Sequence, residues 1–428
     1  MKNQKLKIFF TIWSLCTLHS LQAQMIYVPD PNFRFYLNNN GFSSCMAGDS
    51  IDSNSPVVIN TTSLNIYGYG IYDMEGIQAF SNLQSLTVLN NPITNFPPLP
   101  SSLIYLDCSG NSLTSLPLLP PTLKLLNCSG NVLTSFSSLP DSLVYLNCAY
   151  NQITAISSLP DSLTDFYCFN NPLTSLPALP NSIVSLNCSN CSHLQSLPPL
   201  PASLHYMKCE YDSLTSLPAL PNSLDTLLCK WNKIAMMPAI PNSLLYLDCS
   251  GNNITSIPNF SSSLLYLSCS DNSLSSLPQF PNSLKYIDCV WNALTSLPMP
   301  ALPDSLTFLN CQYNDISVFP ALNLILHELH CDHNNLSSLP AINDSLRDLT
   351  CSYNHISSLP ALNNLNTLFC NSNPIHVLPP LPATLNWLLC ESCGLSSIPP
   401  LPLNLYDLNC GNNPIYSLPA LPSKLFNL

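Results

Sequence analysis

The sequence has few charged residues and little glycine. Only 8% of its 428 residues are Asp, Glu, Lys or Arg, and only 10 are glycine. With 11 basic against 23 acidic residues, the formal charge is −12, and the surface should repel nucleic acid and anionic lipid. No Gly-rich phosphate loop, nucleophile elbow or His-Glu-x-x-His motif is present. We therefore expect neither catalysis nor a bound cofactor.

Long apolar runs are also missing. Outside the first residues, no segment reaches the roughly 18 consecutive apolar residues that a membrane-spanning helix needs. Residues 1–23 resemble a secretory signal peptide, because Lys2, Lys5 and Lys7 precede an apolar stretch and Leu21-Gln22-Ala23 resembles a cleavage site. The sequence therefore predicts a secreted or cell-surface protein. Cleavage after Ala23 would remove three of the 11 basic residues and none of the 23 acidic ones.

Cysteine and proline are abundant, and the cysteines are regularly spaced. The chain has 20 cysteines and 41 prolines. Sixteen cysteines recur in steps of 19 to 22 residues, most of them 20. A fixed period of this length is typical of a solenoid of small stacked units. The regular cysteines are Cys108, Cys128, Cys148, Cys168, Cys188, Cys209, Cys229, Cys249, Cys269, Cys289, Cys311, Cys331, Cys351, Cys370, Cys390 and Cys410.

Each period reads Leu-x-x-Leu-x-Cys-x-x-Asn-x-Leu and continues with Leu-Pro-x-Leu-Pro. Residues 103–113 show the first part and residues 176–180 the second. Over residues 64–428 this pattern resembles the leucine-rich repeat, with cysteine in place of the third leucine. The Leu-Pro form resembles secreted bacterial effectors of the YopM and IpaH type, which carry Val or Leu more often at the cysteine position. The ubiquitin-ligase domain of IpaH-like proteins has no counterpart here, so its activity is not expected.

The resemblance implies a leucine-rich-repeat solenoid with a parallel β-sheet on its concave face. Alternation about Leu106 and Cys108 independently predicts a short strand with both side chains inward. Proline fixes φ near −65°, removes a donor and pushes the preceding residue towards extended geometry. We therefore expect an extended or polyproline-like convex side rather than helices.

The pattern divides the chain into four parts. Residues 1–23 are the expected signal peptide, and residues 24–60 are an expected small helical N-terminal cap that resembles the start of Bacteroidetes leucine-rich-repeat proteins. Phe33, Tyr36 and Leu37 should face the first repeat. Residues 61–100 resemble degenerate, internalin-like repeats. Residues 101–428 hold repeats of about 20 residues, the last one incomplete, which suggests a truncated sequence or a missing C-terminal cap.

An asparagine usually stands three residues after the cysteine. A buried amide at this turn could form hydrogen bonds with backbone groups of its own repeat and of the next. A buried backbone group without such a bond would cost about 1–3 kcal/mol. Cys191, Asp212 and Cys393 take the same position in three repeats. The predicted asparagine ladder comprises Asn111, Asn131, Asn151, Asn171, Asn232, Asn252, Asn272, Asn292, Asn314, Asn334, Asn354, Asn373 and Asn413.

The cysteine column allows three interpretations: small inward hydrophobic side chains, disulfides between repeats, or a metal-binding row of thiols. The pattern favours the first, because in-register strands hold neighbouring side chains about 4.8 Å apart with parallel directions. A separate candidate metal site is Glu328, His330 and Asp332, which should point to the concave side beside Asp348. The alternative for this group is a polar patch on a variable face.

Aromatic residues, together with Asn and Asp, flank the inward positions and predict a binding face. Stacked strands should align Tyr246, Tyr266, Tyr286 and Phe308 beside Asp248, Asp288 and Asn310. Exposed aromatic runs on a sheet are typical of contact surfaces. We therefore expect an extracellular protein-binding scaffold or adhesin. A glycan-binding module that stacks sugars on the rings is the alternative, and a purely structural surface layer is a third possibility.

Overall fold

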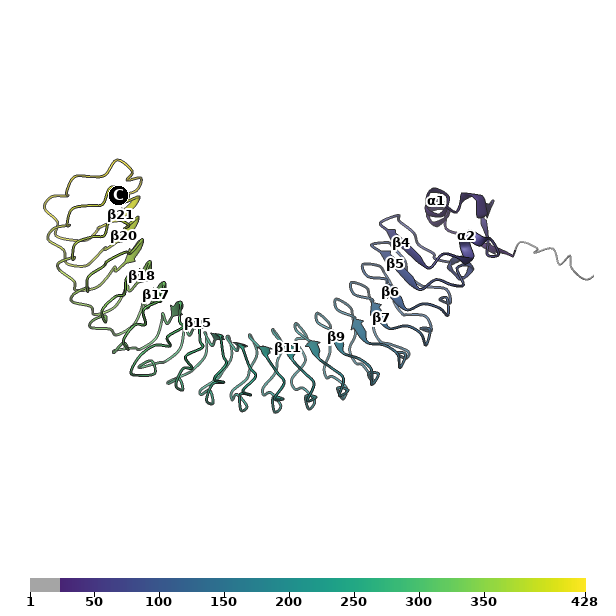
Figure 1. Ribbon diagram of the computed structural model, residues 1–428, viewed down its shortest axis with the longest axis horizontal. Coiled ribbons are helices and arrows are strands. Elements are labelled where there is room, and N and C mark those ends of the chain that lie inside the picture. The colour runs from purple at the N-terminus through teal and green to yellow at the C-terminus, as the bar shows by residue number, and fades with distance from the viewer. Residues whose placement is uncertain (1–23) are drawn as a thin grey trace, which may run out of the picture. The chain divides into compact units, whose positions relative to one another are not determined.

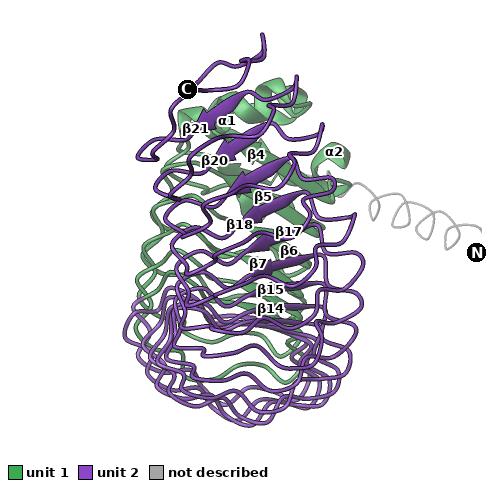
Figure 2. Cartoon of the chain, turned by 90° about the vertical axis from the view of Figure 1, so that its left-hand side faces the viewer, with its two compact units in different colours: residues 1–171 green, residues 172–428 purple. Residues whose placement is uncertain are grey.

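The computed structural model describes residues 24–428, which form two compact units divided after Asn171 (Figure 2). The expected signal peptide, residues 1–23, lies outside the described residues. Each unit is a coil of short parallel strands joined by extended return segments (Figure 1). No helix within residues 24–428 is long and apolar enough to cross a bilayer.

A small cap opens the first unit. It holds an antiparallel sheet of β1 (Met25–Tyr27), β3 (Ser50–Asp52) and β2 (Met46–Ala47), the helices α1 (Pro31–Asn39) and α2 (Pro56–Ile59), and the 3-10 turn η1 (Ser43–Cys45). Proline stands at the first position of α1, where its missing N–H is no loss. Phe33, Tyr36 and Leu37 of α1 are buried.

Asp30 joins this cap to the first repeat. Its Oδ1 accepts hydrogen bonds from the backbone N–H groups of Asn32 at 2.8 Å and Phe33 at 3.0 Å, which caps α1. Its Oδ2 accepts from the N–H groups of Tyr72 at 2.7 Å and Asp73 at 3.1 Å. One buried carboxylate therefore satisfies four backbone donors from two parts of unit 1.

Replacing Asp30 by alanine should destabilise the cap by about 2–3 kcal/mol, because a helix cap and two further charge-assisted bonds are lost. Urea unfolding combined with amide exchange in α1 measures this. Asp49→Ala is the control, since Asp49 is exposed and pairs with Arg34 at 3.2 Å, and it should change stability by less than about 1 kcal/mol. Equal effects of the two substitutions would contradict the role given to Asp30.

Parallel strands pair in chain order within each unit. In unit 1, β4 and β5 are followed by the cysteine-containing repeats, with the 3-10 turn η2 (Ile77–Ala79) between β4 and β5. The strands of unit 1 are β4 (Ser63–Tyr67), β5 (Ser85–Leu89), β6 (Tyr105–Asp107), β7 (Leu125–Asn127), β8 (Tyr145–Asn147) and β9 (Asp165–Tyr167).

Unit 2 continues the same arrangement with strands of three residues. They are β10 (Ser185–Asn187), β11 (Tyr206–Lys208), β12 (Thr226–Leu228), β13 (Tyr246–Asp248), β14 (Tyr266–Ser268), β15 (Tyr286–Asp288), β16 (Phe308–Asn310), β17 (Glu328–His330), β18 (Asp348–Thr350), β19 (Thr367–Phe369), β20 (Trp387–Leu389) and β21 (Asp407–Asn409).

The core of each unit is a set of apolar columns. Leu247 and Cys249 of one repeat, like Leu267 and Cys269 of the next, are fully buried. The cysteines within residues 24–428 are not joined by disulfides, and burial raises the pKa of the column thiols, such as Cys249, above the usual range. They therefore pack as small hydrophobic side chains. Between Ser101 and Leu428 the return segments contain no helix, as the Leu-Pro motif predicts. The predicted solenoid with an extended convex side is confirmed.

Candidate binding face

Four aromatic side chains lie side by side on the sheet face of unit 2, and three of their rings stack face to face. Parallel pairing places Tyr246 beside Tyr266, Tyr266 beside Tyr286, and Tyr286 beside Phe308. The ring centroids of Tyr266 and Tyr286 lie 4.4 Å apart with a 7° interplanar angle, and those of Tyr286 and Phe308 lie 4.4 Å apart at 4°. Tyr246 is tilted by 32° at 6.1 Å from Tyr266. We call these four residues the tyrosine column.

The stacking decides which parts of these rings a ligand can reach. Both faces of Tyr286 are covered by its neighbours, so only the edge of its ring is open to a ligand. Burial, followed by the proximity of Tyr266 and Asp288, raises the pKa of the Tyr286 hydroxyl. Burial also raises the pKa of Tyr266, with Asp248 as the next cause. The Tyr266 and Tyr286 side chains also hydrogen-bond each other, so part of their hydrogen-bonding capacity is already used.

Asp248, Asp288 and Asn310 run beside the tyrosine column, but part of each group is already used. Their Oδ1 atoms accept from the backbone N–H two residues on, which are those of Ser250 at 3.1 Å, Val290 at 3.3 Å and Gln312 at 3.4 Å. These bonds hold the turn that leaves each strand. Burial is the main cause that raises the pKa of Asp288. The sequence predicted ligand-binding groups here and missed their turn-holding role.

A second aromatic column lies at the strand exits, where the repeat period places Trp291, Tyr313 and Tyr353 in line, and His333 completes it. Trp291, Tyr313, His333 and Tyr353 stack in order, with centroid distances of 4.0, 4.2 and 4.3 Å. All four have φ between 53° and 56°, the left-handed region that suits glycine or asparagine. The sequence does indicate that this position needs a positive φ, because other repeats carry glycine there. These glycines are Gly110, Gly130 and Gly251. We call these four residues the strand-exit column.

The residues of the candidate metal site do not converge on one point. His330 Nε2 lies 3.5 Å from Glu328 Oε2, while its Nδ1 lies 3.2 Å from Thr350 Oγ1. Asp332 is buried in the strand-exit turn, where it accepts from the N–H of Ser352 at 2.6 Å and from the Thr350 hydroxyl. Within residues 24–428 no group of three or more His, Cys, Asp or Glu side chains is placed to hold a metal ion. The predicted divalent-ion site is therefore corrected to a hydrogen-bonded cluster.

The asparagine ladder links each repeat to the preceding one, not to the next. Asn252 Nδ2 donates to the carbonyl of Cys249 at 3.0 Å in its own repeat and to that of Cys229 at 3.1 Å in the preceding repeat. Its Oδ1 accepts from the N–H of Ile234, also in the preceding repeat, at 3.0 Å. The side chain reaches the preceding repeat because the turn folds it back towards the strand of that repeat. The ladder thus supports the face without contributing to it.

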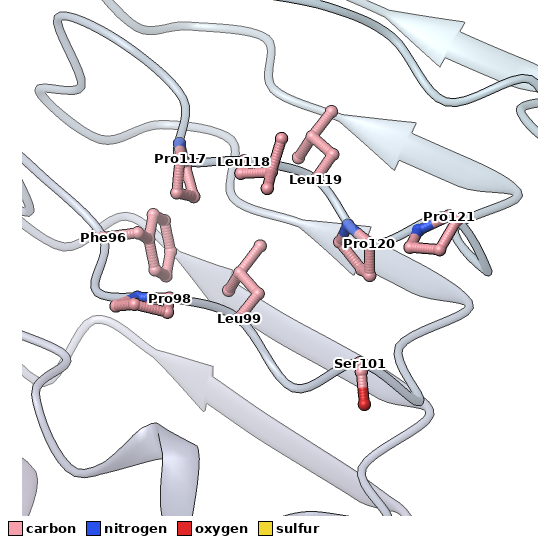
Figure 3. Close-up of a pocket in the computed structure, with 9 residues that line it drawn as sticks. All are labelled: Phe96, Pro98, Leu99, Ser101, Pro117, Leu118, Leu119, Pro120 and Pro121. Carbon is pink, nitrogen blue, oxygen red and sulfur yellow. The ribbon is translucent and has the colours of Figure 1, made fainter.

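An apolar recess of about 500 Å³ lies away from the strands in unit 1 (Figure 3). Phe96, Pro98 and Leu99 line it from one return segment, and residues 117–121 line it from the next. Leu118 is 81% exposed. The residues that line the recess are apolar except for Ser101, so it suits an apolar side chain.

No protein-family model and no curated protein matches the chain. Among solved structures, YopM from Yersinia enterocolitica WA-314 is 32% identical, with a TM-score of 0.70, 86% of this chain covered and 90% of that one. YopM from Yersinia pestis, a leucine-rich effector protein, is 28% identical with a TM-score of 0.56, covering 77% of this chain and 89% of that one. The functional domain of InlJ from Listeria monocytogenes, which includes a cysteine ladder, is 24% identical with a TM-score of 0.61, covering 83% and 77%.

Proposed function

Because the chain belongs to the bacterial-type leucine-rich-repeat proteins, we propose that it is an extracellular scaffold or adhesin that binds a protein partner through the tyrosine column. A solenoid of this kind is typically a binding scaffold without enzymatic activity. The observation that carries the proposal is the stack of Tyr266, Tyr286 and Phe308, which runs beside Asp248 and Asp288. Aromatic side chains of this kind dominate the energetics of protein interfaces.

The ring geometry favours a protein over a glycan. A sugar stacks on the open face of an aromatic ring, but the faces of Tyr286 are covered on both sides at 4.4 Å. Ring edges, phenolic hydroxyls and carboxylates instead suit the side chains and backbone N–H groups of a protein surface. The extracellular setting is part of the proposal and is supported by the signal-like residues 1–23 and by the small number of basic residues.

Replacing both Tyr266 and Tyr286 by alanine should weaken binding of the partner by about 100-fold or more, because two central anchors are lost. The purified chain is first presented to an array of extracellular proteins and to a glycan array, and Kd is then measured for the ligand found. Tyr150→Ala is the control, since Tyr150 is exposed at a strand exit of unit 1, and it should leave Kd unchanged.

Two outcomes would reject this proposal. An unchanged Kd in the double variant would remove the tyrosine column from the interface. Binding to glycans alone would replace the protein partner by the alternative ligand class.

A further inference from the structure

Cys393 takes the ladder position of its repeat in place of asparagine. Its Sγ donates to the backbone carbonyl of Cys370, in the preceding repeat, at 3.1 Å. Asn373 Nδ2 makes the corresponding bond one repeat earlier, to the carbonyl of Cys351 at 2.9 Å. The substitution therefore places a sulfur atom directly against residue 370, which is itself a cysteine.

Cys393 also interacts with the side chain of Cys370. The Cys370 thiol forms a hydrogen bond with Cys393 that lowers the pKa of Cys393 and raises that of Cys370. Burial raises the pKa of column cysteines such as Cys331, which makes them less reactive than Cys393 towards an attacking disulfide. Cys393 is thus a buried thiol whose ionised form has a donor beside it, and that donor is a second thiol.

Cysteine at this position removes a hydrogen bond that asparagine provides. Asn373 Oδ1 accepts from the N–H of Ile356 at 3.0 Å, but Cys393 has no oxygen for the corresponding Ile375. The N–H of Ile375 bonds instead to the carbonyl of Asn373 at 2.9 Å, and His376 adopts a φ of 60°. Cysteine therefore supports this turn less well than asparagine does.

The direction of the two side chains favours a covalent link. Column cysteines on successive strands point the same way at about the strand spacing of 4.8 Å, which is poor geometry for a disulfide. Cys393 instead reaches back across the turn to Cys370, whose backbone carbonyl lies 3.1 Å from Cys393 Sγ. Such a disulfide would tie together two consecutive repeats.

We propose that Cys370 and Cys393 are a redox-active dithiol that a low-molecular-weight disulfide such as glutathione disulfide converts to an intramolecular disulfide. The Cys393 thiolate attacks one glutathione sulfur, forms a mixed disulfide and releases one glutathione thiolate. The Cys370 thiolate then attacks Cys393 Sγ and releases the second. Two protein thiols are oxidised and one glutathione disulfide is reduced to two thiols, which take up the two protons that the protein thiols lose. Both sulfur atoms are buried, so the reaction proceeds through local opening of the turn.

The test is a mass map of the full chain after incubation with glutathione disulfide, acid quenching, alkylation and peptic digestion. The expected product is a linked peptide pair containing Cys370 and Cys393, lighter by two hydrogens than the two thiol peptides. Cys331 and Cys351, a column pair with Asn354 at the ladder position, should be recovered as alkylated thiols. Alkylated Cys370 and Cys393, or glutathione on Cys393 beside a free Cys370, would overturn the proposal.

Cys393→Asn provides the matched variant. It should fold, because the amide restores a donor to the Cys370 carbonyl and an acceptor for the Ile375 N–H. The wild-type Tm should differ between glutathione and glutathione disulfide, and this difference should vanish in the variant. A variant that keeps the same redox-dependent shift would also overturn the proposal. The outcome is independent of the partner proposed for the tyrosine column.

Discussion

Asp212→Asn is expected to stabilise the protein by about 3–5 kcal/mol at pH 8 and to have little effect near pH 4. Asp212 takes a ladder position, where its Oδ1 accepts from the N–H of Cys191 at 2.6 Å and its buried Oδ2 has no partner. Burial raises the pKa of Asp212 to about 8, the N–H of Cys191 lowers it, and Glu210 raises it further. A carboxylate here faces carbonyl groups to which asparagine would donate.

The direction of the pH effect follows from proton binding. The unfolded chain loses the Asp212 proton near pH 4, whereas the folded chain keeps it until about pH 8. Between these values the folded state binds more protons, so wild-type stability falls as pH rises, by about 1.4 kcal/mol per pH unit. Asparagine has no such proton, so the variant should lose this slope.

Urea unfolding of both proteins across this pH range measures the difference. Asn232→Asp is the matched control, because Asn232 donates to the carbonyls of Cys209 and Cys229 at the next ladder position. It should create a second loss of stability with the same pH dependence. If Asp212→Asn leaves the pH profile unchanged, the carboxyl is ionised in the folded protein and the interpretation fails.

Asn252→Ala should destabilise unit 2 by about 3–5 kcal/mol. The substitution removes three donations, to the carbonyls of Cys229, Cys249 and Ser250, and the acceptor of the Ile234 N–H. Asn252 is only 8% exposed, so water cannot replace these partners without opening the turn. Each buried group left unmet costs about 1–3 kcal/mol.

The neighbouring Asn253 supplies the control for this substitution. Asn253 is exposed, and its backbone N–H bonds to the carbonyl of Ile234. Asn253→Ala keeps that bond and should change the free energy of unfolding by less than about 0.5 kcal/mol. Similar urea midpoints for the two alanine variants would show that the ladder amide contributes little.

The period predicted the tyrosine column, but not which parts of its rings are exposed. A repeat of 20 residues fixes the strand register, so residues one period apart, such as Tyr266 and Tyr286, must be neighbours. Side-chain torsions are free of that constraint, and they decide that the rings stack face to face. The same period aligns Trp291, Tyr313 and Tyr353 at the strand exits, whereas the positive φ of these residues and the place of His333 among them come from the structure.

Local hydrogen bonding explains the two corrections. Spacing on a strand placed Glu328, His330 and Asp332 on one face, but Asp332 lies just beyond β17, where the backbone already turns. Its carboxylate therefore serves the N–H of Ser352 rather than a metal. Likewise, the period could not tell whether an amide such as Asn252 reaches the preceding repeat or the next, since both are one period away.

Site-specific photo-crosslinking tests the central claim that the tyrosine column is the partner's binding surface. A photoreactive phenylalanine analogue is placed at Tyr286 in one protein and, in another, at Met236, which is 72% exposed on a return segment. Each is irradiated with the protein partner identified by binding. We expect a crosslinked complex from position 286 and none from position 236. A crosslink at 236 alone would place the partner on the return segments and contradict the account.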